Sequence, residues 1–249
     1  MPRAKATSLA LALAAWLGAA IPAHTGDLRL EPVSLVMHPS EDSTSLWLSN
    51  TGRQPLQAQV RLFSWTQDGG GEVLAPTRDL AVSPPLMEVP PLGRQRVRLV
   101  RLGSGSPATE TAYRLVVDEL PSTVAASAAG AGSEASLLRY SIPVFVQPSA
   151  PAAASRLSAR IEEDASGRRL LRLDNSGGRH ARIAGLAFVG TGGRRHVLAP
   201  NLAGYVLAGR YKLWPLPEEA GQPPYGRFEA DVNGEPVVLV PEQVLISGR

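Results

Sequence analysis

The chain has 249 residues, 44% of them hydrophobic, which is enough for one or two domains with buried cores. Its 22 prolines and 24 glycines favour short strands and turns over long helices. Because there is no cysteine, a disulfide framework and thiol catalysis are excluded. An all-β fold is therefore predicted.

The first residues have the features of an export signal. Two basic residues precede an uncharged apolar run at 9–21, and small residues permit cleavage after Ala20 or Ala23. The run is shorter than the roughly 18 residues that a membrane span needs, so residues 1–23 are predicted to be a signal peptide and the mature chain is not expected to insert in a membrane. Removing them leaves 23 Lys and Arg against 22 acidic residues, a net charge of +1, which gives no reason to expect nucleic-acid binding.

Alternation of apolar and polar residues with a period of two marks a series of strands after the signal. Turn residues lie between them, and the run Asp68-Gly69-Gly70-Gly71 is typical of a hairpin. The strands predicted in the first half of the chain are 28–36, 45–50, 59–65, 80–85, 95–101, 112–120 and 137–146. Strands at this spacing are typical of an immunoglobulin-like sandwich, here over 27–148.

The predicted strand at 137–146 is unusual because it lies between two segments in which Ala, Gly and Ser dominate. Its alternation places Leu138, Tyr140 and Ile142 on one face. Pro143 cannot donate a hydrogen bond to a ladder, and within sheets proline is confined to edges, strand starts and bulges. We therefore predict an edge strand with one open side, of the kind that pairs with another chain by strand addition.

A short proline-bearing segment at 149–155 is predicted to link the first domain to a second one at 156–249. The same succession of strand and turn recurs in this second domain. Its predicted strands are 169–175, 181–189, 196–198, 204–207, 212–214, 227–230 and 237–240. The fold class predicted for the mature chain is all-β, with two β-sandwiches in tandem.

Several short motifs follow one another along the chain. They are Leu48-Ser49-Asn50, Ser83-Pro84-Pro85, Val97-Arg98-Leu99, Tyr113-Arg114-Leu115 running into Asp118-Glu119-Leu120-Pro121, and Ser141-Ile142-Pro143-Val144-Phe145 with Pro148. Their order and spacing resemble the periplasmic chaperones of the chaperone-usher pathway, which assemble pili and fimbriae. The last motif and Gly204-Tyr205-Val206-Leu207 are similar to the archaic branch of that family, whose subunits resemble spore-coat-type pilins.

This resemblance implies two immunoglobulin-like domains in an L-shaped arrangement and a periplasmic location. It also implies that the chain binds pilin subunits, which lack a final strand, by lending them a strand of its own, and delivers them to an outer-membrane usher. The side chains implied as lent are Leu138, Tyr140, Ile142 and Val144. The alternative is that they face the chain's own core, against which Tyr140 argues because a buried tyrosine hydroxyl needs a partner.

Chaperones of this family anchor the subunit's C-terminal carboxylate with an arginine in the first strand and a lysine in the lending strand. This chain has Ser34 and Pro143 at those positions, and neither is a cation. Since a carboxylate pairs best with an arginine fork, Arg98 is the first candidate anchor, followed by Arg96 and Arg139. The alternative is that Arg96, Arg98 and Arg101 form a solvated face of an edge strand.

Charged residues also join the two domains in this family. Glu119 matches the acidic member of that network, Asp231 matches a second member, and Gln147 stands where an arginine is usual. These three residues are therefore expected between the domains. The alternative for Glu119 is a surface carboxylate at a strand end.

Patterns that indicate catalysis are missing from the sequence. Its histidines have no metal-ligand spacing, and it has neither a Gly-x-Ser-x-Gly elbow nor a phosphate-binding glycine loop leading into a helix. We therefore predict a protein that is not an enzyme and that uses no metal or cofactor. The alternative function is that of an exported structural or adhesive β-sandwich protein of the cell surface, because sandwiches host many functions.

Overall fold

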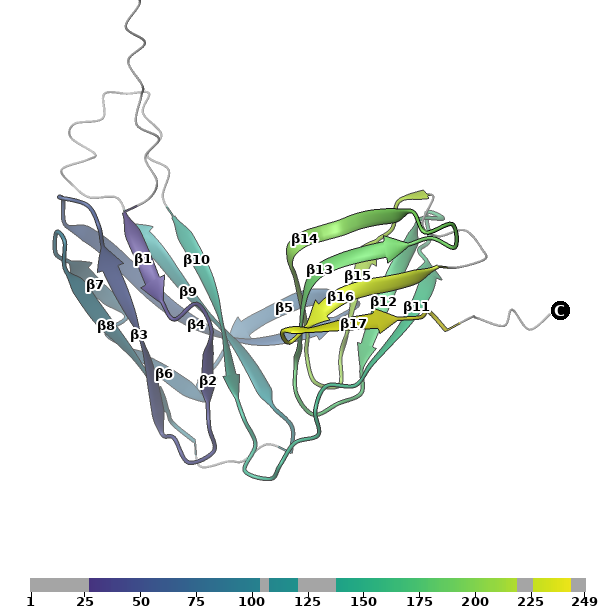
Figure 1. Cartoon of the computed structure of the whole chain (residues 1–249). Coiled ribbons are helices and arrows are strands. Elements are labelled where there is room, and N and C mark those ends of the chain that lie inside the picture. The colour runs from purple at the N-terminus through teal and green to yellow at the C-terminus, as the bar shows by residue number, and fades with distance from the viewer. Residues whose placement is uncertain (1–26, 104–107, 121–137, 219–225, 243–249) are drawn as a thin grey trace, which may run out of the picture.

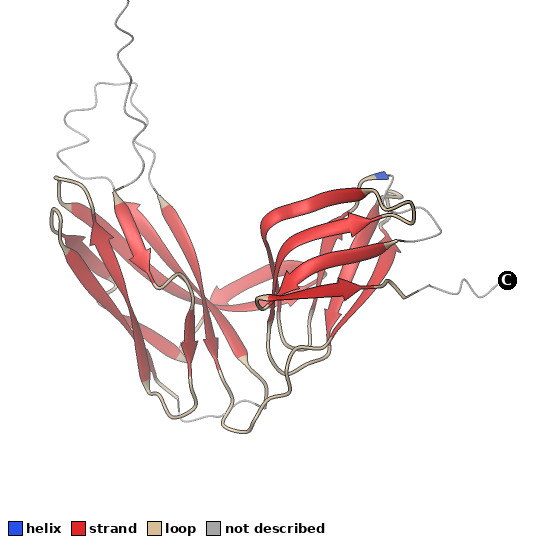
Figure 2. Cartoon of the chain, in the orientation of Figure 1, coloured by secondary structure: helices blue, strands red, loops and turns tan. Residues whose placement is uncertain are grey.

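The computed structural model is built almost wholly from strands (Figure 2). It describes residues 27–103, 108–120, 138–218 and 226–242. The predicted signal peptide and the Ala-, Gly- and Ser-rich segment before Leu138 lie outside these described residues. In the described part of the chain, no helix has the length and apolar character needed to cross a membrane.

The first domain consists of two sheets that face each other across a hydrophobic core. One sheet has the order β1-β3-β8-β6, and the other has the order β2-β10-β9-β4-β5 with β7 paired to β4. The strands are β1 (Leu28–Glu31), β2 (Leu35–Met37), β3 (Ser43–Asn50), β4 (Leu56–Asp68), β5 (Gly71–Pro76), β6 (Leu80–Ser83), β7 (Leu86–Val89), β8 (Arg94–Arg101), β9 (Thr111–Leu120) and β10 (Arg139–Val146).

The single strand predicted at 28–36 is divided by Pro32 into two strands of different sheets. β1 pairs antiparallel with β3, whereas β2 pairs parallel with β10. Leu28 and Leu35 are nevertheless buried in the same core, since the chain crosses from one facing sheet to the other. The core-facing residues are even-numbered before the proline and odd-numbered after it, so the alternation predicted through 28–36 changes phase where the strand is divided.

The hairpin predicted at the glycine run is confirmed, and it is longer than expected. β4 and β5 are joined at Gly69 and Gly70, whose positive φ angles of 56° and 77° suit a two-residue turn. β5 was not predicted because every one of its side chains is exposed, so its sequence has no apolar alternation. Gly70 packs against Leu213, so the hairpin tip reaches the second domain.

The second domain is a smaller sandwich with a core of its own. Its sheets have the orders β11-β12-β15 and β14-β13-β16-β17. The strands are β11 (Leu157–Glu163), β12 (Arg169–Asn175), β13 (Ala181–Val189), β14 (Arg195–Val206), β15 (Tyr211–Pro215), β16 (Arg227–Val232) and β17 (Glu235–Leu239). The segments predicted separately at 196–198 and 204–207 belong to β14, whose pairing with β13 shifts register several times.

The two domains meet through a small cluster formed by Trp65 and Phe145 of the first domain and Tyr205 and Leu207 of the second. From this contact they diverge, which gives the molecule the bent, L-like shape seen in Figure 1. The sheet face that carries Trp65 and Phe145 is called the concave face below. The expectation of two tandem immunoglobulin-like sandwiches is confirmed.

Candidate functional site

One flank of β10 lacks a partner over half its length. On one side β10 pairs with β9 from Arg139 to Val146. On the other side its parallel pairing with β2 covers only Val144 to Val146. The stretch 139–143 therefore has a flank on which the described residues place no strand, because β1, which precedes β2, has joined the opposite sheet (Figure 1).

The direction of the backbone groups along β10 follows from two hydrogen bonds. The carbonyl of Leu138 accepts a bond from the amide of Glu119 at 2.9 Å, and the amide of Gln147 donates to Met37 at 3.0 Å. Since successive residues of a strand turn their N–H and C=O groups to opposite sides, even-numbered residues face β9 and odd-numbered ones face the other flank. Arg139 and Ser141 therefore present their backbone groups to the open edge. The missing N–H of Pro143 also points to this flank, where it breaks no bond within the domain.

The side chains expected to be lent to a partner are only partly available. Ile142 is 4% exposed and Val144 is 0% exposed, and both pack in the first domain's own core. This corrects the prediction for these two residues, since a side chain that fills this core cannot also fill a partner's. Tyr140 is half-buried against the same core, and its hydroxyl donates to the carbonyl of Leu28 at 2.6 Å. The partner that its hydroxyl needs is thus supplied from within the chain.

Leu138 is the exception among the four. It lies just before β10, beyond the last core residue of the strand, and lines an open groove of about 500 Å³ together with Gln59, Glu119 and Leu120. Its side chain points to the same face of the strand as those of Tyr140 and Ile142. A partner's core that extended this sandwich beyond the end of β10 would therefore receive Leu138. Leu138 is therefore the predicted lent side chain that remains available.

Two arginines line the same groove on the concave face, joined by a buried carboxylate. Asp118 is 8% exposed, and it accepts hydrogen bonds from Arg61 at 2.6 Å and from the Nε of Arg139. Burial raises the pKa of Asp118, but the bonds from Arg139 and Arg61 outweigh it and hold the pKa below its ordinary value. Asp118 thus stays ionised and fixes two guanidinium groups beside Leu138.

The other two predicted anchors are wrongly placed for a site at this edge. Arg96 and Arg98 lie on β8 of the opposite sheet, and their neighbours Val97 and Leu99 are fully buried in the core. Alternation therefore directs both arginines outward, away from the concave face. Arg98 donates to the hydroxyl of Ser43 at 2.8 Å. Of the three candidates only Arg139 lies at the open edge.

The positions where the family has two cations are neighbours, as the resemblance implies. Leu35 is paired with Val144, so Ser34 and Pro143 precede a matched pair on parallel strands. On the other side of Pro143, directly opposite on β9, is Arg114. Its guanidinium lies 3.6 Å above the ring of Trp65 and 3.2 Å from Glu72. Arg114 thus provides a cation on β9, one strand away from the position in β10 where the family has a lysine.

In the described part of the chain, none of the three residues expected between the domains forms a hydrogen bond or ion pair across them. Glu119 lines the groove at the far end of β9, where it is a strand-end carboxylate as the alternative interpretation has it. The Oε1 of Gln147 accepts a bond from the Nδ1 of His38 at 3.1 Å within the first domain. Asp231 lies 3.9 Å from Arg182 within the second. The prediction of an interdomain network made of these residues is wrong.

The domains are joined by other polar residues. The side chain of Gln67, 2% exposed, donates to the carbonyl of Tyr205 at 2.7 Å and accepts from the amide of Leu207 at 3.0 Å. Glu110 accepts a bond from the amide of His180 at 2.9 Å and lies 2.6 Å from its ring nitrogen.

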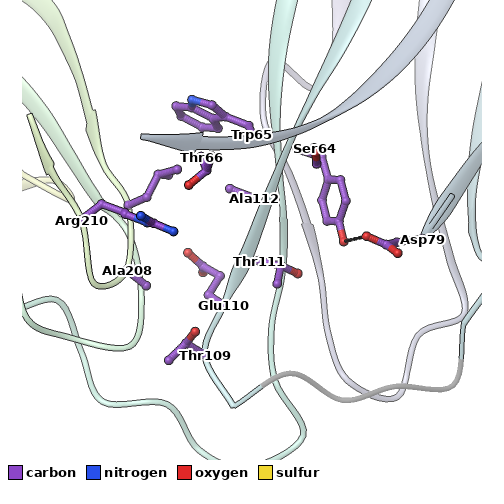
Figure 3. Close-up of a pocket in the computed structure, with 12 residues that line it drawn as sticks. Ser64, Trp65, Thr66, Asp79, Thr109, Glu110, Thr111, Ala112, Ala208 and Arg210 are labelled. Carbon is purple, nitrogen blue, oxygen red and sulfur yellow. Dashed lines mark hydrogen bonds between the residues drawn. The ribbon is translucent and has the colours of Figure 1, made fainter. Parts of the chain in front are cut away.

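The ring of His180 is also stacked on Phe145, with centroids 3.5 Å apart. A pocket of about 280 Å³ opens beside these contacts. Trp65 and Glu110 lie on one wall and Arg210 on the other (Figure 3).

The described residues contain no cluster of three or more His, Cys, Asp or Glu side chains arranged to hold a metal ion. The groove and the open flank are lined by backbone groups, by Leu120 and Leu138, and by polar and charged side chains of which Arg61, Asp118 and Arg139 are paired. What this arrangement offers is a set of hydrogen-bond donors and acceptors for an extended chain, next to a cationic pair.

Comparison with known proteins gives a consistent result. The family model of the pili and flagellar-assembly chaperones, PapD N-terminal domain, matches residues 27–152. Among curated protein sequences there is no match.

Solved structures of three chaperones share the fold. A chaperone from the archaic chaperone-usher Csu pili of Acinetobacter baumannii, solved in a pre-assembly complex with a tip adhesion subunit, has 22% identity and a TM-score of 0.70, covering 88% of this chain and 100% of that one. The SafB chaperone of Salmonella enterica, solved with the SafA pilin, has 17% identity and a TM-score of 0.60, covering 86% and 95%. The CupB2 chaperone of Pseudomonas aeruginosa has 18% identity and a TM-score of 0.57, covering 84% and 97%.

Proposed function

Because the chain belongs to the family of pili and flagellar-assembly chaperones that carry the PapD N-terminal domain, we propose that it binds pilin subunits through the open flank of β10 and delivers them to an outer-membrane usher. This family consists of chaperones and not of enzymes. The observation that carries the proposal is the unpaired stretch 139–143, bordered by Leu138. A pilin that lacks its final strand offers the complementary edge.

The backbone of the open flank supplies most of the proposed attraction. Arg139 and Ser141 each offer an N–H and a C=O, whereas the carbonyl of Pro143 belongs to the pairing with β2. A typical hydrogen bond contributes about 0.5–1.5 kcal/mol net, so this short ladder contributes a few kcal/mol. Burial of Leu138 in the subunit's groove adds about 1.5–3 kcal/mol. The ladder has no donor at Pro143, which limits its length and leaves the lent strand displaceable by a better one.

We also propose that Arg139 receives a carboxylate of the subunit, preferably the one at its C-terminus. Arg139 lies on the concave face at the start of the lent stretch, and its guanidinium is fixed by Asp118. With Arg61 on the other side of Asp118, the cluster keeps one positive charge in excess. The predicted signal peptide supports a periplasmic location for this chemistry, where subunits emerge from export.

The role as a chaperone is tested by co-expression with candidate pilins and purification through a tag on the pilin. The expected result is a one-to-one complex from which the pilin cannot be freed without aggregating. Recovery of a stable, soluble pilin in cells that lack this chain would contradict the role.

Replacing Arg139 with glutamine is expected to weaken the subunit complex about 10- to 100-fold. The variant removes one charge-assisted hydrogen bond, which is typically worth about 1.5–3 kcal/mol, although Arg61 still neutralises Asp118. Isothermal titration with a peptide-stabilised pilin measures the change. Arg98→Gln is the matched control, since it removes the same charge from the opposite sheet, and an equal loss in both variants would refute a specific role for Arg139.

A further inference from the structure

The outer face of the β1-β3-β8-β6 sheet carries a concentration of arginines that the proposed function does not use. Register places Arg94 beside Ser49, Arg96 beside Trp47 and Arg98 beside Ser45. Arg29 of β1 lies on the same face, across from Ser49. Among the outward-facing side chains of these four strands, Glu31 is the acidic one. This surface, made of Arg29, Trp47, Arg94, Arg96 and Arg98, is called the arginine face.

The charges of the arginine face are left uncompensated by the rest of the described chain. None of its four arginines forms an ion pair with a described residue, whereas Arg61, Arg114 and Arg139 on the concave face each have a carboxylate partner. The mature chain has almost no net charge, so this local excess is a feature of the fold and not of composition. An exposed field of one sign attracts a partner of the opposite sign.

An aromatic ring and a leucine accompany these cations. The guanidinium of Arg94 lies 4.4 Å from the ring centroid of Trp47, and that of Arg96 lies 5.9 Å from it. Beyond Arg94, Leu92 is 75% exposed at the tip of a turn. Its φ of 53° is in the left-handed region, which costs a non-glycine residue about 1–2 kcal/mol and is a reason to look for a function.

Leu92 and Arg94 also share an open groove of about 440 Å³ with Ser49 and Thr51. This groove places an exposed apolar side chain next to a guanidinium and two hydroxyl groups. Such a combination suits a molecule with a phosphate at one end and a hydrocarbon at the other. Arginine pairs with phosphate in a bidentate manner, and tryptophan is favoured where a surface is apolar on one side and wet on the other.

We propose that the arginine face and Leu92 dock this protein on an anionic phospholipid surface. Arg94, Arg96 and Arg98 form a row spaced by roughly 7 Å, as alternate residues of a strand must be, and a repeating layer of phosphates meets such a row better than one acidic side chain does. The face belongs to the sheet turned away from the second domain, so docking leaves the concave face and the open flank of β10 accessible (Figure 1).

Co-sedimentation with vesicles tests this proposal. The protein is recovered after export, and its N-terminus is checked by mass spectrometry so that the apolar run at 9–21 is absent. We expect binding to vesicles of phosphatidylcholine with about one third phosphatidylglycerol, weakening as salt is raised, and no binding to pure phosphatidylcholine. Each arginine is expected to contribute about fivefold, so the variant Arg94→Ser, Arg96→Ser, Arg98→Ser should bind about 100-fold more weakly.

A matched variant controls for total charge. Arg78→Ser, Arg156→Ser, Arg179→Ser removes three exposed arginines from other places, and it should bind the vesicles as the unchanged protein does. Thermal melting shows that both variants are folded. Equal loss of binding in the two variants, or no binding of the unchanged protein to the mixed vesicles, would overturn the proposal.

Two further arms separate a lipid surface from an acidic polypeptide. Leu92→Ser should weaken vesicle binding about threefold, because Leu92 is expected to reach the apolar layer with only part of its side chain. It should leave any binding to poly-L-glutamate unchanged. Binding to poly-L-glutamate without binding to vesicles would identify an acidic protein surface as the partner and contradict a membrane, as would vesicle binding that is indifferent to Leu92.

Discussion

A chain carrying Ser141→Pro is expected to fold normally and to bind a pilin subunit about 30-fold more weakly. The N–H of Ser141 faces the open flank of β10, so its removal leaves the ladder with β9 intact. In the complex, the change removes one hydrogen bond and leaves a buried carbonyl of the subunit unpaired, a loss of about 2 kcal/mol. Titration calorimetry with a peptide-stabilised pilin measures the affinity.

Ser141→Ala is the control for this substitution. It removes the hydroxyl of an exposed side chain but keeps the backbone N–H, so its affinity for the subunit should be unchanged. Thermal melting should give similar midpoints for both variants. If Ser141→Pro binds the subunit as tightly as Ser141→Ala does, the flank of β10 is not where the subunit's strand pairs.

Replacing Gln67 with alanine is expected to lower the free energy of unfolding by about 3 kcal/mol and to loosen the angle between the domains. Gln67 is buried and satisfies the carbonyl of Tyr205 and the amide of Leu207 across the interface. Removing its amide leaves both backbone groups buried without a partner, at a cost of about 1–3 kcal/mol each. Urea denaturation measures the stability, and small-angle scattering measures the change in domain angle.

The matched control for Gln67 is Gln57, which lies on the same strand with an exposed side chain. Gln57→Ala should change the free energy of unfolding by less than about 0.5 kcal/mol. A loss in Gln67→Ala no greater than that of Gln57→Ala would show that the interface is held without Gln67, by the aromatic cluster around Phe145 and the bonds between Glu110 and His180.

The fold and the edge strand were predictable from local patterns. Apolar alternation identifies most strands because one face of each is buried. It misses β5, which has no buried face, and the strands β7 and β11 were not predicted either. Pro143 indicated an edge because proline has no N–H, and in the structure it lies opposite Arg114 of β9 and at the point where the pairing with β2 begins. These inferences need only the period of a strand and the chemistry of one residue.

The burial of the edge strand's side chains in the core of this chain was not predictable from local patterns. The alternation of Tyr140, Ile142 and Val144 is the same whether this chain or a partner supplies the core, so only the facing sheet decides. The hydroxyl of Tyr140 misled the prediction because its partner, the carbonyl of Leu28, is distant in sequence. A buried polar group shows that a partner exists but does not say from where it comes.

The anchoring and interdomain residues depend on how distant segments meet. Arg98 and Arg139 are both exposed arginines on strands, and nothing local shows that they lie on opposite sheets. Gln67 and Glu110 stand at the ends of strands, where polar residues are common, and their burial follows from contact with Tyr205, Leu207 and His180 of the other domain. An isolated polar residue at the end of an otherwise regular strand is the signal that sequence analysis passed over.

Amide hydrogen exchange on the purified complex of this chain with a pilin subunit tests the central claim most directly. The amides of Arg139 and Ser141 face no strand among the described residues, so they should exchange freely in the unbound protein. The account predicts that both become protected at least about 100-fold when the subunit binds, as ladder amides in a buried sheet are. Unchanged exchange at these two amides, with protection appearing elsewhere on the chain, would contradict it.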